Sequence, residues 1–158
     1  MSTDRVFLRH ALATIAYRGG KTLRDASPDF ATYGSEGSSQ TPAKIVAHIG
    51  DLMEWALSMA DGSRKWNSST PLPWDKECER FHATIKKFDD YLASDQPLQA
   101  PIEKLLQGPV ADALTHVGQL AMLRRQAGCP IQGENYFAAE ITTGRVGADQ
   151  APPRKPFG

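Results

Sequence analysis

The stretch TPAKIVAHIGD, residues 41–51, begins an amphipathic helix and carries a histidine beside its apolar face. Thr41 is a good N-cap and Pro42 suits the first helical position, so the start of the helix is well defined. Apolar residues then recur at helical spacing until Asp61-Gly62, where the helix is expected to end. His48 lies at the edge of the apolar arc. An imidazole in that position needs a polar partner from elsewhere in the chain.

Three further segments have apolar residues at helical spacing. They run from Thr3 or Asp4 as N-cap to about Ala26, from Trp74 to Leu92, and from Pro109 to Ala127. The end of the last helix should be well defined, because Gly128 suits the C′ position and Pro130 follows it. A short helical turn at 101–106 precedes it, separated by Gln107-Gly108-Pro109. Residues 134–142 could add a further short helix.

Two long polar segments, residues 27–40 and 62–73, separate the first three helices. Each is long enough to span a bundle, so simple up-and-down connectivity is not imposed. With no strand alternation, the pattern predicts an all-α fold, a four-helix bundle with long crossover-type loops. We expect the bundle to comprise residues 1–143. Residues 144–158 contain three prolines and are expected to form an irregular tail.

The composition argues against several classes of protein. Lys plus Arg and Asp plus Glu number 18 each, so no basic field favours nucleic acid or an anionic membrane. No apolar run is long enough to span a bilayer, and no signal peptide precedes the first helix, so a cytoplasmic protein is expected. Cys78 and Cys129 lack the spacing of a zinc finger, a redox motif or a disulfide framework.

Asp112 and His116 are the best candidates for partners of His48. They are four residues apart on one helix, so their side chains project from the same face, about 40° apart. If the two helices are neighbours, two imidazoles and one carboxylate converge. That set suits zinc with an open water position, or octahedral iron, nickel or manganese. The alternative is an Asp112–His116 ion pair, with His48 bonded to a backbone carbonyl; spacing alone favours this alternative.

The other polar candidates are weaker. His10 and His82 lack a spaced acidic or histidine partner. Asp51, one turn after His48, could orient that ligand, although a solvated neighbour of His48 is the commoner arrangement. Cys78 belongs to an apolar stripe and reads as a buried thiol, whereas Cys129 follows a helix C-terminus, which does not activate a thiol. A last polar cluster could line a pocket mouth or serve only in capping and solvation: Glu134, Asn135, Tyr136 and Glu140.

Two segments resemble the DinB/YfiT-like metalloenzyme family. One is AHIGD, residues 47–51, and the other spans 112–128, with HVGQL at its centre and RRQAG at its end. The resemblance implies a four-helix bundle of non-simple connectivity, usually a homodimer, with a divalent metal held by one histidine from the second helix and two from the fourth. Matched by position, these ligands are His48, Asp112 and His116, so an aspartate stands where the family commonly has a histidine.

The resemblance also implies a type of chemistry. Characterised members of the family include transferases that use low-molecular-weight thiols and a maleylpyruvate isomerase. We therefore expect a divalent-metal-dependent enzyme, a thiol-dependent transferase or hydrolase acting on a small electrophile, with Gln119 or Asp51 supporting the ligands. Its cofactors would be a transition metal and a low-molecular-weight thiol. The alternative is a non-catalytic dimeric module, stress-associated or partner-binding, with a vestigial metal site. The sequence identifies no general base.

Overall fold

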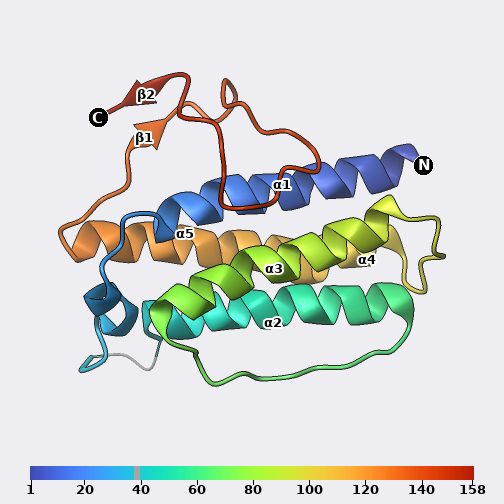
Figure 1. The fold of residues 1–158 in the computed structure, drawn as a ribbon, viewed down its shortest axis with the longest axis horizontal. Helices are drawn as coiled ribbons and strands as arrows, with labels where there is room; N and C mark the ends of the chain where they lie inside the picture. Colours follow the sequence, from blue (N-terminus) through green and yellow to red (C-terminus); the bar gives the residue numbers. More distant parts are fainter. Residues whose placement is uncertain (38–39) are drawn as a thin grey trace.

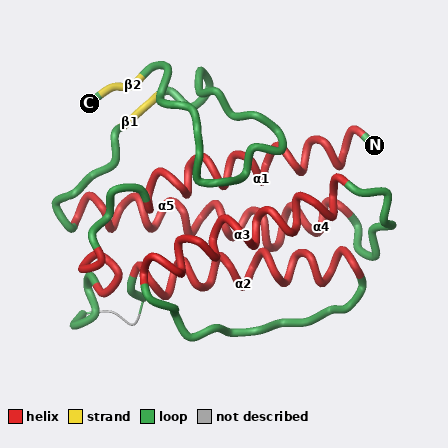
Figure 2. Tube along the Cα trace, viewed as in Figure 1, coloured by secondary structure: helices red, strands yellow, loops and turns green. Residues whose placement is uncertain are grey.

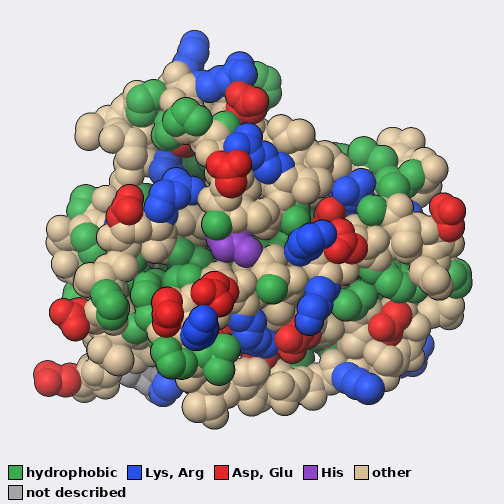
Figure 3. All heavy atoms as spheres, in the orientation of Figure 1, with side chains coloured by type: hydrophobic (Ala, Val, Ile, Leu, Met, Phe, Trp, Pro, Cys, Tyr) green, Lys and Arg blue, Asp and Glu red, His purple; other side chains and the backbone are tan. Residues whose placement is uncertain are grey.

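The computed structural model describes residues 1–37 and 40–158 and is dominated by four long helices (Figures 1 and 2). The all-α class expected from the sequence is therefore confirmed. None of the helices in the described ranges is both long and apolar enough to cross a lipid bilayer. On the face drawn in Figure 3, Lys and Arg side chains are interspersed with Asp and Glu side chains. The long helices are α1 (Thr3–Leu23), α2 (Pro42–Asp61), α3 (Trp74–Ala93) and α5 (Ala111–Gln126).

Helices α2 and α3 run in the same direction, so the bundle is not an up-and-down array. Near their starts, Arg80 of α3 donates to the Ala47 carbonyl of α2 at 3.0 Å. Just beyond the end of α3, the Gln99 amide donates to the Ala60 carbonyl, near the end of α2, at 2.8 Å. Residues 62–73 therefore return along the whole length of α2 as an extended crossover (Figure 1). The expected crossover-type loop is confirmed here.

The helix termini follow capping chemistry. The Thr41 hydroxyl accepts from the Lys44 amide at 3.4 Å, and Gly62 ends α2 with φ of 87°, both as predicted. The start of α1 differs from the prediction. Its N-cap is Ser2, whose hydroxyl accepts from the Arg5 amide at 3.3 Å. Its end is also earlier than Ala26, because the chain turns into extended backbone at residue 24.

The expected break at 107–109 is absent. A short α4 (Ile102–Leu105) passes through a π-helical turn, η2 (Leu106–Val110), directly into α5. A proline inside an α-helix clashes with the carbonyl four residues earlier and has no N–H to donate. The wider π turn contains Pro109 and so continues the helix where an α turn would kink.

The core lies between the four helices, and its packing depends on one close approach. Gly19 of α1 faces the ring of Phe81 on α3, and a Cβ at this position would overlap that ring. The absence of a side chain therefore lets α1 and α3 pack closely. The largest fully buried side chains around this contact come from all four helices and include Leu12, Ile49, Met53, Phe81, Phe88 and Leu120.

The segment after α5 lies over α1 (Figure 1). The predicted helix at 134–142 does not form. Instead, β1 (Gly133–Glu134) pairs antiparallel with β2 (Pro156–Phe157). The buried Glu134 carboxylate accepts from the Tyr17 hydroxyl at 2.5 Å and from the Lys21 ammonium at 2.7 Å. These bonds fix the start of the segment to α1. Within 144–158, expected to be an irregular tail, Val146 is only 4% exposed and joins the core.

Candidate metal centre

The structure brings His48, Asp112 and His116 together at the contact between α2 and α5. One ligand atom from each residue can be chosen so that all three lie within 4.8 Å of one another. The Nε2 atom of His48 lies 3.7 Å from Oδ2 of Asp112, and Nε2 of His116 lies 3.4 Å from Oδ1. Both imidazoles thus present the same nitrogen to one carboxylate. The intrahelical contact between Asp112 and His116 forms, but His48 faces the carboxylate as well.

The spacing of these atoms suits a shared ion. Donor atoms bound about 2.0–2.2 Å from one divalent ion lie roughly 3.3–3.6 Å from each other in tetrahedral geometry and roughly 2.8–3.1 Å in adjacent octahedral positions. The two nitrogen–oxygen distances, 3.4 and 3.7 Å, which end on different oxygens of Asp112, are close to the tetrahedral range. The donors are neither buried nor fully solvated, with side-chain exposures of 37%, 47% and 20% for His48, Asp112 and His116. Three ligands on one side leave room for water or a substrate on the other.

Gln119 fixes the orientation of His116. Its Oε1 atom lies 2.7 Å from Nδ1 of the imidazole. An amide oxygen only accepts hydrogen bonds, so Nδ1 is the protonated nitrogen and donates. Nε2, the nitrogen that faces Asp112, is then the one left to bind a metal ion. Histidines that bind metals commonly have such a partner on their other ring nitrogen, and this contact is the one that the expected supporting role of Gln119 requires.

Asp51 has a different role from the one considered above. It is 3% exposed, and its carboxylate holds the crossover rather than His48. The amide and the hydroxyl of Ser69 donate to it at 2.8 and 2.6 Å, and Arg80 donates at 2.7 Å. Glu77, also buried, accepts from Arg80 and from the Leu72 amide. Residues 69–72 are thereby fixed against α2 and α3.

The fixed crossover forms one wall of a cavity of about 480 Å³ beside the two histidines. This volume is of the size that small-molecule sites occupy. Nine of its ten lining residues are polar or charged, although their aliphatic atoms form much of the wall. The lining residues are Gln40, Lys44, His48, Asp51, Ser68, Ser69, Thr70, Pro71, His116 and Gln119.

Two tryptophans border the cluster. The Trp66 ring, in the crossover, makes edge contacts with His48 and with Trp55, each with centroids 5.9 Å apart. Trp66 is 50% exposed. A second hollow, of about 410 Å³, includes Trp55 and Asp112, and the π turn contributes Gln107 and Gly108 to its wall. The sequence did not indicate either tryptophan, because their contact depends on the path of the crossover.

The remaining histidines and cysteines lie outside the cluster. The ring of His10 bonds the Thr143 hydroxyl at 3.0 Å, and His82 donates to the Val146 carbonyl at 3.3 Å. Burial, with the nearby Glu77 and Asp75 carboxylates, raises the pKa of the Cys78 thiol to about 11. Cys78 is therefore a weak nucleophile, although its side chain is half-buried and not fully buried as expected.

The polar residues after α5 make structural contacts, and of them only Tyr136 lines a cavity among the described residues, a separate one of about 190 Å³ beside Arg18. Glu134 is buried against α1, and the Tyr136 ring stacks under the Arg18 guanidinium, 4.0 Å from its carbon. Glu140 pairs with Arg154 at 2.8 Å, and this bond lowers the pKa of the carboxyl. None of these residues lines the 480 Å³ cavity.

Comparison with known proteins identifies no relative: no protein-family model, no curated protein and no solved structure matches the chain.

Proposed function

We propose that this protein is a divalent-metal-dependent enzyme that acts on a small electrophile, either as a thiol-dependent transferase or as a hydrolase. The observation that carries the proposal is the convergence of two imidazole nitrogens and a carboxylate oxygen within 4.8 Å, beside a cavity of about 480 Å³. Nitrogen and oxygen donors in this ratio suit zinc, nickel, iron or manganese. A metal ion there would lower the pKa of a bound water or thiol toward neutrality.

The residues around the cluster have separable roles under this proposal. His48, Asp112 and His116 would hold the ion, and Gln119 keeps the lone pair of His116 on Nε2. Trp66 covers one side of His48 and shields it in part from water. Asp51 acts at a distance, because its bonds to Ser69 fix the cavity wall.

We also propose membership of the DinB/YfiT-like family. Two features support it: the parallel pair α2 and α3 joined by a crossover, and the position of the three donors on α2 and α5. Asp112 is the departure from the common three-histidine set. It lowers the net charge of a bound divalent site by one, which favours harder ions than three imidazoles would.

The test is metal content. Protein purified without added metal is analysed by inductively coupled plasma mass spectrometry as wild type, His116→Ala and His10→Ala. We expect close to one ion per chain in the wild type and in His10→Ala, and a loss of at least ten-fold in His116→Ala. His10 is the matched control, because it is a histidine outside the cluster.

Circular dichroism separates loss of the ion from loss of the fold. A folded His116→Ala protein that lacks metal supports the proposal. Metal-free wild type that has the same stability with and without a chelator contradicts it and favours the alternative, a non-catalytic module with a vestigial site. Retention of the ion by folded His116→Ala contradicts it as well.

A further inference from the structure

One cation faces the cavity beside the metal cluster. Lys44 lies one helical turn before His48 on α2, so the two side chains share a face, and both line the same cavity. The Lys44 side chain is exposed. Within residues 1–37 and 40–158, no carboxylate forms an ion pair with its ammonium group.

The acidic groups nearby leave this charge uncompensated. Asp51 is the other charged residue in the cavity wall apart from the metal cluster, and both of its oxygens are engaged by Ser69 and Arg80. Glu54 and Glu77 also contact Arg80 but do not line the cavity. With a divalent ion on His48, Asp112 and His116, the cavity would carry a net positive charge, which favours an anionic ligand.

The facing wall offers hydrogen-bond donors. Ser68 and Thr70, on the crossover, line the cavity, and among the described residues neither hydroxyl has a hydrogen-bond partner. The bonds from Ser69 to Asp51 fix the backbone between them. An ammonium group and two hydroxyls match the single charge and two oxygens of a carboxylate. A phosphate dianion usually recruits arginine or several backbone amides, and the lining residues include no arginine.

We infer that the cavity binds the carboxylate of a small substrate or co-substrate whose reacting end points toward His48 and His116, with Lys44 as the specificity residue. This inference rests on the proposed metal-dependent function. The ligand expected in the cavity is a small carboxylic acid, held by the Lys44 ammonium group and by the hydroxyls of Ser68 and Thr70. A neutral or cationic ligand should bind more weakly.

The test uses two probes of the same size, of which one ends in a carboxylate and the other in a neutral amide that has one acceptor oxygen fewer. Protein loaded with cobalt(II) is titrated with 3-mercaptopropionate and with 3-mercaptopropionamide, and thiolate binding is followed by the sulfur-to-cobalt charge-transfer absorption. The thiolate is a good ligand for such ions, so both probes carry the same reporter. We expect the carboxylate probe to bind about ten-fold more tightly than the amide.

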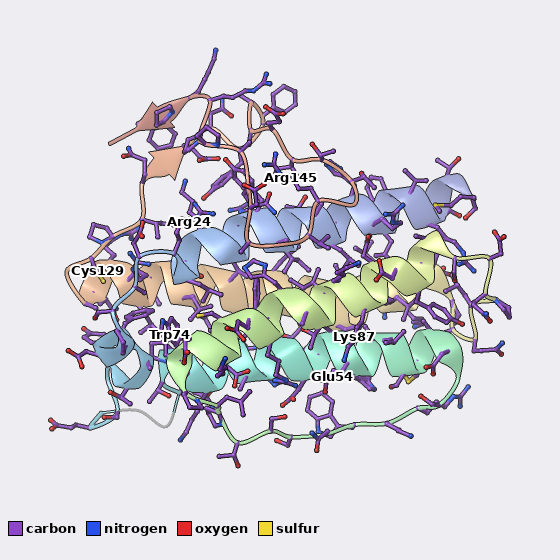
Figure 4. The ribbon with its side chains drawn as sticks, viewed as in Figure 1. Arg24, Glu54, Trp74, Lys87, Cys129 and Arg145 are labelled. Atoms are coloured by element: carbon purple, nitrogen blue, oxygen red, sulfur yellow. The ribbon has the colours of Figure 1, made fainter. Side chains whose placement is uncertain are left out.

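Three variants test whether Lys44 causes the preference for the carboxylate probe over the amide probe. Lys44→Met should remove it, Lys44→Arg should retain most of it, and Lys87→Met should leave it unchanged. Lys87 is the charge-matched control, because it is exposed on α3 (Figure 4) and does not line the cavity. Equal affinities for the two probes in the wild type, or a preference that survives in Lys44→Met, overturn the inference while leaving the metal centre intact. A wild type that takes up no cobalt overturns the metal centre, and this inference with it.

Discussion

The Nδ1 atom of His116 lies 2.7 Å from the Oε1 atom of Gln119, three residues further along α5. This bond selects one tautomer of the histidine and holds the ring in place. The other nitrogen, Nε2, is then the only one that can bind an ion, and it is the one that faces Asp112 at 3.4 Å. Gln119, which is not one of the three proposed ligands, therefore determines which nitrogen of His116 faces Asp112.

Gln119→Leu should weaken metal binding by about ten- to a hundred-fold, because the imidazole loses its acceptor and rotates more freely. Gln119→Glu is the control, since it keeps an acceptor at the same position. Competition with a coloured chelator measures both affinities. Equal affinity for wild type and Gln119→Leu would show that packing alone orients His116.

Asp51→Asn should destabilise the fold by about 2 kcal/mol, because a buried carboxylate that compensates Arg80 and binds Ser69 is replaced by a neutral amide. Urea denaturation measures the loss. Glu54→Gln is the matched control, since Glu54 contacts the same arginine at 3.2 Å, from α2, but its side chain is 43% exposed (Figure 4). That substitution should cost less than about 1 kcal/mol. Equal costs would refute the anchoring role of Asp51.

Gly19→Ala should destabilise the protein by about 1–3 kcal/mol, because its Cβ would overlap the Phe81 ring in the core. Gly118→Ala on α5 provides the comparison. No atom lies within 4 Å of the position of its Cβ, so alanine there should stabilise the helix by about 0.5–1 kcal/mol. Thermal unfolding of both variants gives the sign of each effect. A stabilised Gly19→Ala would mean that α1 and α3 can separate without cost.

His82 should make the stability depend on pH. Burial lowers its pKa below the ordinary value of 6.5, and the charge of Arg24 lowers it further, against the opposing effect of the bond to the Val146 carbonyl. The unfolded chain therefore binds the proton first as pH falls. The contribution of His82 is fully present above pH 6.5 and is lost as pH falls below it.

The His82→Gln variant provides the comparison. Its free energy of unfolding should change less between pH 7.5 and 5.5 than that of the wild type, and the difference between the two changes should be roughly the effect of a single titrating group. Urea denaturation at both pH values provides the measurement. An identical fall in stability for both proteins would assign the pH dependence to other residues.

The sequence predicted those parts of the fold that depend on local chemistry. Thr41, Pro42 and Gly62 mark α2 because capping acts within one turn. The pairing of Asp112 with His116 was likewise readable, since both lie on one helix. His48 can approach Asp112 and His116 only if α2 and α5 are neighbours. The sequence pattern is compatible with that arrangement but does not predict it.

The parts that were missed depend on contacts distant in sequence. Asp51 appeared to be a partner of His48, one turn away, but its partners are Ser69 and Arg80, 18 and 29 residues further along. The pattern at 134–142 allows a short helix, whereas Glu134 lies in a strand that pairs with Pro156 and its carboxylate is buried against α1. The π turn at Pro109 was read as a break, because helix propensity does not describe a wider turn.

The edge contact between Trp66 and His48 makes the candidate centre optically observable without any label. An open-shell ion such as cobalt(II) or copper(II), held a few ångströms from the indole, would quench its emission. Trp74, packed 5.8 Å from Phe30 at the start of α3, does not line either hollow beside the ligands and provides an internal reference. Fluorescence of the native chain can therefore follow site occupancy in real time. Replacement of both Trp66 and Trp55, which lines the hollow beside Asp112, by Phe should abolish most of the quenching.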